Sequence, residues 1–207
     1  MIDSLFSEID RALKILTVKP VPRRIRPDSS TIQNKTLTQK EKALSAKLMR
    51  VNHTGEVCAQ GLYRGQLLFN KNLLIKSELE AAALEEIDHL SWCESRIEDL
   101  EGKVSKLNPI FYFGSFAMGS IASIIDEKYN LGFLEETEKQ VTEHLGDHLK
   151  KIPKKDIKTK KILEKIQEDE KKHQLSAKKM GAIELPAPLK AVMKVTSKIM
   201  TTSTYRV

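Results

Sequence analysis

Two histidines of this chain each follow a glutamate by three residues, as Glu86–His89 and Glu170–His173, and the chain has only five histidines. Positions i and i+3 of an α-helix share a face, so each pair can bind one metal ion. Four-helix di-metal sites combine two such helices with one further glutamate from each of the other two helices. The two motifs therefore predict a pair of helical hairpins that meet around a metal centre.

The further glutamates are found by spacing. Glu56 lies 30 residues before Glu86 (86 − 56), and Glu138 lies 32 residues before Glu170 (170 − 138). Antiparallel helices present such ligands at the same height only if the turn falls midway between them. One midpoint falls in an Asn-Lys-Asn segment and the other in an Ile-Pro-Lys segment, and both interrupt helical patterns. The spacing thus predicts Glu56 and Glu138 as the remaining carboxylate ligands.

Each candidate glutamate occupies a position that otherwise belongs to an apolar stripe of helical period. Around Glu138 the stripe includes Leu134 and Val141, which favours Glu138 over its neighbour Glu135, although Glu135 stays an alternative. Four buried carboxylates cost several kcal/mol each unless they are compensated. Two divalent cations would balance their charge. Carboxylate and imidazole ligands suit iron or manganese, and spacing does not separate these two metals.

Capping residues divide the chain into helices. We expect residues 1–37 to form a short helix (4–17) and a proline-containing linker, and residues 38–207 to form the metal-binding domain with an amphipathic tail. The four expected core helices run from Thr38 to near Phe69, from Ser77 to Gly102, from the end of an apolar stretch to before Pro153, and from Asp156 to Gly181. The prediction is an all-α, ferritin-like four-helix bundle with a long apolar crossover and extra N- and C-terminal helices.

Two segments have the character of membrane-facing helices. Residues 107–125 carry no formal charge over 19 positions, near the length of a membrane span. Polar residues and glycines dilute this stretch, so we expect a buried or interface-lying helix of a peripheral protein. In the tail, Lys190, Lys194 and Lys198 recur beside an apolar stripe. That pattern predicts a helix that packs on the bundle or lies on a membrane surface.

The net charge of +7 is carried largely by lysines of the second half. They are not interleaved with aromatic residues and form no nucleic-acid-binding motif, so we expect no nucleic-acid partner. Cys58 and Cys93 lack metal-type spacing and are interpreted as ordinary helix residues of a reducing compartment.

Three glycines and two histidines of the core helices need a separate explanation. Gly55, Gly61 and Gly65 each cost roughly 1 kcal/mol inside a helix, which predicts a close helix contact or room for a ligand. His144 and His148 lie four residues apart, a spacing that could also indicate another metal site, but we expect them to be solvated or to support the metal ligands.

The residues around the ligands resemble the demethoxyubiquinone hydroxylase family. The matching segments are Asn52–Glu56, Leu62–Gln66, Glu85–Leu90, Leu107–Ser115, Glu136–Leu145, Glu168–His173 and Leu185–Met200. The resemblance covers roughly residues 38–207, and none of the six ligand positions departs from the pattern. Residues 1–37 are similar to bacterial members, which lack a mitochondrial presequence.

The resemblance implies an O2-dependent monooxygenase that hydroxylates the ring of a demethoxyubiquinol or demethoxyubiquinone intermediate in ubiquinone biosynthesis. Its cofactor would be a carboxylate-bridged pair of iron ions per chain, with O2 as co-substrate and an electron donor that the resemblance does not specify. The implied ligands are Glu56, Glu86 and His89 for one iron and Glu138, Glu170 and His173 for the other. The assignment of the bridging glutamates stays open.

The same resemblance implies partners and a location. The partners would be a polyprenyl quinone or quinol, the membrane surface and other ubiquinone-biosynthesis proteins. The protein would be a peripheral membrane protein on the cytoplasmic face of the cell inner membrane. The alternatives are a ferritin-like iron-binding or storage protein and another di-metal oxidase, because a fold does not determine a function.

Overall fold

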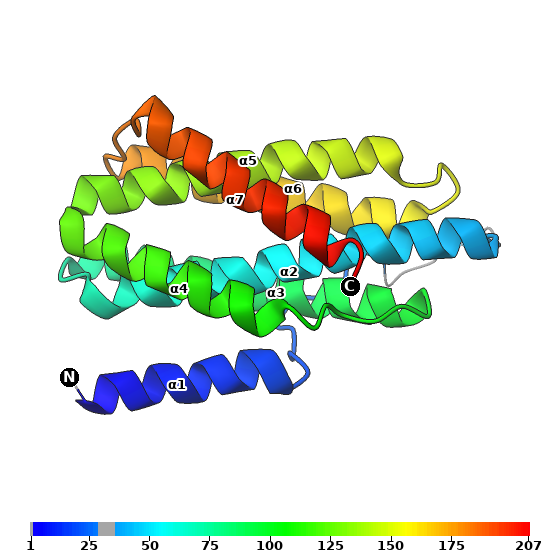
Figure 1. The fold of residues 1–207 in the computed structure, drawn as a ribbon, viewed down its shortest axis with the longest axis horizontal. Helices are drawn as coiled ribbons and strands as arrows, with labels where there is room; N and C mark the ends of the chain where they lie inside the picture. Colours follow the sequence, from blue (N-terminus) through cyan, green and yellow to red (C-terminus); the bar gives the residue numbers. More distant parts are fainter. Residues whose placement is uncertain (1, 29–35) are drawn as a thin grey trace.

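The computed structural model describes residues 2–28 and 36–207, and the described part contains seven helices (Figure 1). They are α1 (Ile2–Thr17), α2 (Gln39–Phe69), α3 (Leu73–Asp99), α4 (Asn108–Ile125), α5 (Glu127–Lys151), α6 (Ile157–Lys179) and α7 (Ala187–Thr204). The hairpins α2–α3 and α5–α6 form a four-helix bundle, and α4 is the crossover between them. The expected all-α, ferritin-like fold is confirmed.

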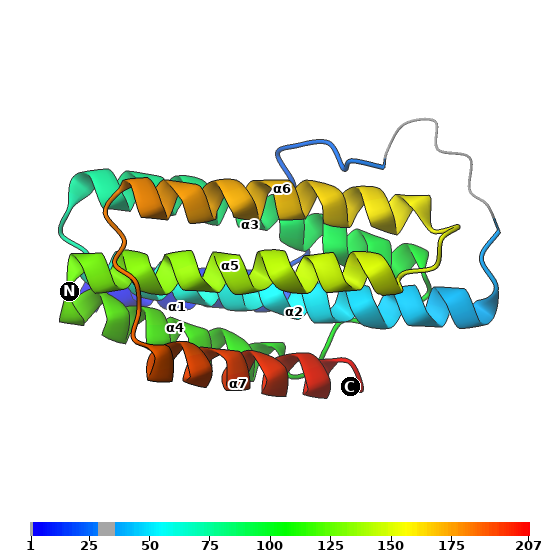
Figure 2. The same cartoon turned by 90° about the horizontal axis from the view of Figure 1, so that it is seen from above.

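Helices α4 and α7 and the segment that follows α1 cover two opposite faces of the bundle, while α1 itself packs beside α2 and α4. Figure 2 shows α3 and α6 in one layer, α2 and α5 in the next, and α4 with α7 outside α2 and α5. Residues 18–28, which we call the N-terminal strap, run along the α3 and α6 side. The metal centre expected in the middle of the bundle therefore has α4 and α7 on one side and the strap on the other.

Side-chain caps determine where most of these helices begin. Thr38 and Glu41 form the expected capping box before α2, and the Asp156 carboxylate accepts the backbone N–H of Thr159 at the start of α6. The expected start of α3 at Ser77 is wrong, because α3 begins at Leu73. The Asn72 side chain causes the earlier start, since it accepts the first free backbone N–H groups of the helix.

The end of α3 also differs from the expectation in its detail. The last helical residue is Asp99, and Glu101, not Gly102, adopts the left-handed backbone conformation, with φ of 61°. The Gly102 N–H donates to the Ile97 carbonyl at 2.8 Å, which completes a Schellman motif. Gly102 is needed for packing, because a Cβ there would lie 2.9 Å from the Cβ of Ala46.

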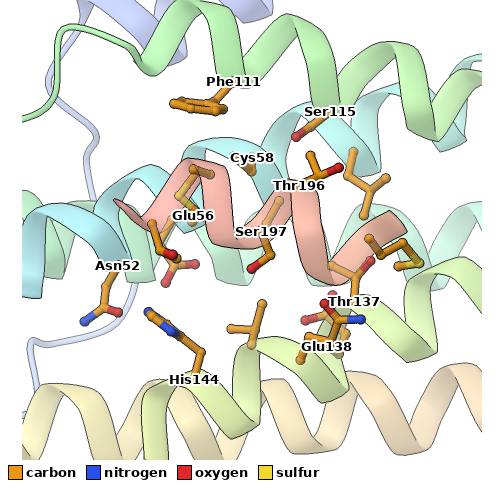
Figure 3. A pocket seen from close by; sticks show the side chains of 18 of the residues that line it. Asn52, Glu56, Cys58, Phe111, Ser115, Thr137, Glu138, His144, Thr196 and Ser197 are labelled. Atoms are coloured by element: carbon orange, nitrogen blue, oxygen red, sulfur yellow. The ribbon is translucent and has the colours of Figure 1, made fainter. Parts of the chain in front are cut away.

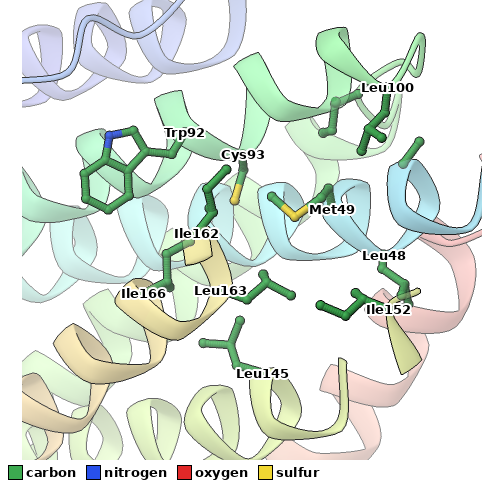
Figure 4. Close-up of a cluster of buried hydrophobic side chains, with 12 residues drawn as sticks. Leu48, Met49, Trp92, Cys93, Leu100, Leu145, Ile152, Ile162, Leu163 and Ile166 are labelled. Atoms are coloured by element: carbon green, nitrogen blue, oxygen red, sulfur yellow. The ribbon is translucent and has the colours of Figure 1, made fainter. Parts of the chain in front are cut away.

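Two apolar clusters fill the bundle and flank its centre along the axis. The larger cluster, drawn in Figure 4, consists of Ala46, Leu48, Met49, Trp92, Cys93, Ile97, Leu100, Leu145, Ile152, Ile162, Leu163 and Ile166. The second consists of Tyr63, Leu67, Ile75, Leu79, Ala83, Leu131, Leu134 and Ala177. These residues confirm the inward stripes expected from the sequence. Any polar group between the clusters is held in a dry environment.

Helix α4 packs closely along α2 through glycines. A Cβ at Gly61 would overlap the carbonyl oxygen of Tyr112, and a Cβ at Gly65 would overlap that of Phe116. Gly119 of α4 makes the reciprocal approach to the backbone of α2. The close helix contact expected of Gly61 and Gly65 is therefore confirmed. Helix α4 is also the one helix in the described ranges that is long and apolar enough to cross a membrane, and 28% of it is buried.

This contact makes a testable prediction for stability. Gly65→Ala should lower the free energy of unfolding by about 2–3 kcal/mol, because the backbone of α4 must move away from α2. Gly114→Ala is the matched control within the same helix pair. A Cβ at Gly114 meets nothing within 4 Å, so the gain in helix propensity should leave stability equal or slightly higher. Urea denaturation measures both variants, and equal stabilities would contradict the close contact.

Candidate metal centre

The structure brings all six expected ligand side chains together in the middle of the bundle. One group consists of Glu56, Glu86, His89 and Glu170, and a second consists of Glu138, Glu170 and His173; within each group the potential ligand atoms lie within 4.8 Å of one another. The residues come from α2, α3, α5 and α6, one carboxylate from each helix. Glu170 belongs to both groups, so the two positions adjoin.

Glu86 and Glu170 each face both histidines. The Glu86 Oε2 atom lies 3.0 Å from His89 Nδ1, and its Oε1 atom lies 3.2 Å from His173 Nδ1. The Glu170 Oε1 and Oε2 atoms each lie 3.3 Å from a histidine Nδ1, that of His89 and that of His173 respectively. A carboxylate that points one oxygen at each of two positions has the geometry of a bridging ligand.

Glu56 and Glu138 occupy the two ends of this arrangement. The Glu56 Oε2 atom lies 3.8 Å from His89 Nδ1. On the other side, Glu138 Oε1 accepts a hydrogen bond of 2.8 Å from the Tyr63 hydroxyl. Each of these two glutamates thus belongs to one position only, which is the geometry of a terminal ligand.

The charges of the cluster fit two divalent cations. Burial and the neighbouring carboxylates Glu86 and Glu170 raise the pKa of Glu56 well above its usual value, and burial and Glu170 do the same to the pKa of Glu138. Burial opposes a charge on His89, but the surrounding carboxylates outweigh it and raise its pKa. Such a cluster holds extra protons when it has no metal, and two dications could replace them. The Glu86 Oε1 atom is buried and, although His173 Nδ1 lies 3.2 Å away, it accepts no well-aligned hydrogen bond from the described residues, which also suits a metal ligand.

The neighbouring residue Glu135 lies outside both groups. Its Oε1 atom accepts a hydrogen bond of 2.8 Å from Gln174 Nε2. The geometry therefore supports Glu138 as the ligand from α5, as the apolar stripe of that helix predicted.

Sequence reasoning missed the side chains that lie next to the Nε2 atoms of the two histidines, on the side away from the carboxylate cluster. The His89 Nε2 atom lies 3.3 Å from Asp169 Oδ2, and that oxygen also accepts a hydrogen bond of 2.8 Å from Arg24. The His173 Nε2 atom lies 3.5 Å from Glu85 Oε2. Asp169 and Glu85 each directly precede a ligand glutamate, a signal that could have pointed to them. Arg24 lies in the linker, where no pattern indicated it.

A cavity of about 320 Å³ ends on the carboxylates Glu56, Glu138 and Glu170. It lies between α2, α4 and α5 and beneath α7 (Figure 3). Most of its wall is apolar, with side chains that include Val51, Leu62, Phe111, Met118, Phe133, Val141, Met193 and Met200. Gly55 lines the cavity, and a Cβ there would meet nothing within 4 Å. This glycine therefore leaves room for a ligand, as the sequence predicted.

The two histidines of α5 differ in their surroundings. His148 is buried, and its Nδ1 atom lies 2.9 Å from Asn52 Oδ1, so the expectation of a solvated side chain is wrong for it. Burial, then His144 and Lys151, lower the pKa of His148 to about 3, which keeps this histidine neutral. His144 lines the cavity (Figure 3).

Fold and site together define a ferritin-like helical bundle with a buried carboxylate–histidine centre at the end of an apolar cavity. Comparison with known proteins narrows this class. The family model described as ubiquinone biosynthesis protein COQ7 matches residues 43–204. The chain belongs to this family.

Its relatives include proteins named 3-demethoxyubiquinol 3-hydroxylase. The protein from Chromobacterium violaceum is 45% identical over 207 residues and covers 100% of both chains. The protein from Legionella pneumophila strain Paris is 47% identical over 207 residues, covering 99% of this chain and 96% of its own. The protein from Bordetella pertussis is 44% identical over 204 residues, covering 99% and 92%.

The choice between neighbouring glutamates of α5 is directly testable. Glu138→Ala should reduce the bound metal from about two ions per chain to about one or fewer, because it removes a terminal ligand of one position. Glu135→Ala is the matched control and should keep the full metal content. Elemental analysis of freshly purified protein measures both, and the reverse result would exchange the roles of the two carboxylates.

Proposed function

We propose that this protein is the 3-demethoxyubiquinol 3-hydroxylase of its organism and works with a carboxylate-bridged pair of iron ions. The observation that carries the proposal is the apolar cavity that ends on three of the six candidate ligands. A metal centre used for chemistry needs access for an organic substrate, and the relatives' printed names supply its class, a demethoxyubiquinol.

The residues of the chain have distinct parts in this function. Glu86 and Glu170 would bridge the two ions, with Glu56 and His89 completing one position and Glu138 and His173 the other. The pair of irons, when bound, would activate O2 for the hydroxylation, with the electrons supplied by a separate reduced donor. The protein excludes bulk water with the two apolar clusters, and the Tyr63 hydroxyl holds Glu138 in place.

The shape of the cavity suits a substrate with a small ring and a long apolar tail. Its volume of about 320 Å³ is near the lower end of the range for small-molecule pockets. A ring can reach the carboxylates, and a polyprenyl tail must leave through the outer part of the cavity. Ile110 of α4 and Thr196 of α7 belong to its lining and are exposed at the surface. The tail would therefore leave next to α4 and α7.

The outer surfaces of α4 and α7 support a peripheral position on a membrane. Exposed aliphatic and aromatic side chains lie on both helices, namely Ile110, Phe113, Ile121, Ile124 and Ile125 of α4 and Val192, Val195 and Ile199 of α7. Lys190, Lys194 and Lys198 lie on α7 as well. Apolar side chains beside lysines suit the surface of an anionic bilayer. We place this face on the cytoplasmic side of the inner membrane, where a lipid-soluble substrate could pass from bilayer to cavity.

The apolar cavity is also what favours a hydroxylase over an iron-storage protein with the same ligands. A storage site admits hydrated ions, for which polar access is suitable. Here the wall is mostly apolar, which suits a quinol ring better than an ion. Other ubiquinone-biosynthesis proteins remain candidate partners in delivering that ring.

The activity is tested in a strain that lacks this hydroxylation and accumulates the demethoxy precursor. The gene should restore ubiquinone, and Gly55→Leu should not, because the larger side chain fills the cavity. Gly55→Ala is the control and should retain much of the activity. Quinone profiling with metal analysis separates the causes. No rescue by the well-expressed wild-type gene would contradict the proposed hydroxylase, and loss of iron in Gly55→Leu would contradict the cavity argument.

The membrane position is tested by flotation with anionic liposomes. Wild-type protein should float with the liposomes. Ile121→Asp/Ile124→Asp should reduce the bound fraction about tenfold or more, because two charges enter the proposed membrane face. The matched control, Val21→Asp/Ile25→Asp, places the same charges at exposed positions of the strap and should float like wild type. Equal flotation of all three would overturn the assignment of this face.

A further inference from the structure

The N-terminal strap runs along the α3 and α6 side of the bundle, opposite α4 and α7 (Figure 2). Its Arg24 side chain reaches the outer surface of α3 and α6, where it meets the carboxylates of Asp88, Asp169 and Glu85. Arg24 Nε donates to Asp88 Oδ2 at 2.6 Å, and Arg24 Nη1 donates to Asp169 Oδ2 at 2.8 Å. The same Nη1 atom lies 3.6 Å from Glu85 Oε2. One guanidinium thus links the carboxylates on the outer side of both histidines.

Further contacts hold Arg24 in this position. The guanidinium lies over the Trp92 ring, 4.9 Å from its centroid, and the Trp92 indole N–H donates to the Arg24 carbonyl at 3.4 Å. The backbone N–H of Arg23 donates to Asp88 Oδ1 at 2.6 Å. Asp88 is buried, so the strap supplies the charge and the donors that this carboxylate needs.

The contact with Asp169 extends to the metal centre. The Nδ1 atom of His89 faces the candidate ligand carboxylates Glu86 and Glu170. Its Nε2 atom lies 3.3 Å from both Asp169 Oδ2 and Arg24 Nη2. With Nδ1 turned to the carboxylates, Nε2 carries the proton, and of these two neighbours only Asp169 can accept it. Lys165 holds the other oxygen of Asp169 at 2.8 Å, with Lys172 beside it at 3.3 Å. Outer hydrogen bonds of this kind determine the orientation of a ligand ring.

The corresponding support of His173 is weaker. Its Nε2 atom has no hydrogen-bond partner in the described part of the chain, and the facing carboxylate of Glu85 lies 3.5 Å away. The side chain of Glu85 is 45% exposed, whereas that of Asp169 is 2% exposed. Solvent therefore competes for Glu85 and not for Asp169. The two halves of the centre have similar ligands but unequal outer support.

We propose that Arg24 is a positioning residue that fixes His89 through Asp169, so that the His89 position retains its metal ion longer than the His173 position. This inference rests on the proposed function, since it needs a centre that holds two ions. It assigns a role to a segment that precedes the part of the chain matched by the family model.

The test follows the release of ferrous iron from the full chain to a coloured chelator under anaerobic conditions. Wild-type protein should lose its two ions in two phases of about one ion each. Arg24→Gln should accelerate the slow phase about tenfold, the size expected when the outer partner of a ligand is lost. Arg23→Gln is the matched control for charge. Arg23 offers only its backbone N–H to Asp88 in the contacts described above, so its variant should release iron like wild type.

Two further variants test the route of the effect. Asp169→Asn should accelerate the same slow phase. The double variant Arg24→Gln/Asp169→Asn should release iron no faster than either single variant, because both changes break the same connection from Arg24 through Asp169 to His89. Arg24→Lys keeps the charge without the planar fork and should give an intermediate rate, which preserves the test if Arg24→Gln does not fold.

The outcomes separate this inference from the proposed function. Wild-type protein that binds no iron would overturn the proposed function itself. Wild-type protein with two ions, and an Arg24→Gln rate within about twofold of wild type, would overturn the role of Arg24 alone. Equal acceleration of both phases would also overturn it, because a strap that merely stabilised the fold would affect both ions alike.

Discussion

The structure depends on the burial of four carboxylates between two apolar clusters. Glu56, Glu86, Glu138 and Glu170 come from four different helices, and in a dry core their charges repel one another strongly. Protons on the cluster or metal ions among the ligands relieve this repulsion. Bound protons or metal ions at the centre therefore hold the four helices together. Without them, the repulsion between the carboxylates would destabilise the bundle. Metal binding at a site assembled from several helices stabilises the folded state.

Only certain arrangements of helices can serve such a centre. The ligands must be shielded from water, yet an organic substrate must reach them from one side. Gly61 and Gly65 let helix α4 pack directly on the backbone of α2. The cavity lies between α2, α4 and α5, beneath α7. Helix α7 covers the cavity while burying only Thr204 completely. A helix so loosely held suits the side through which a substrate enters.

The side of the centre that faces the N-terminal strap is polar, unlike the cavity side. There the strap brings an arginine to buried carboxylates, and ion pairs and hydrogen bonds replace the apolar wall. The centre is therefore open to an apolar substrate on one face and supported by ion pairs and hydrogen bonds on the other. The proposed membrane face coincides with the open side, which is the arrangement that a lipid-soluble substrate requires.

Local spacing by itself predicted the core helices, the two hairpins and the six candidate ligand positions, because a helical period and an i, i+3 pair are properties of short segments. It also favoured Glu138 over Glu135, since the apolar stripe of α5 is local. It misplaced the start of α3, where the Asn72 cap outweighed the later Ser77. Tertiary structure alone decided which glutamates face both histidines, where the cavity lies and which outer groups hold each histidine. Arg24 and Asp169 are 145 residues apart, and only the packing of the whole chain brings such residues into contact.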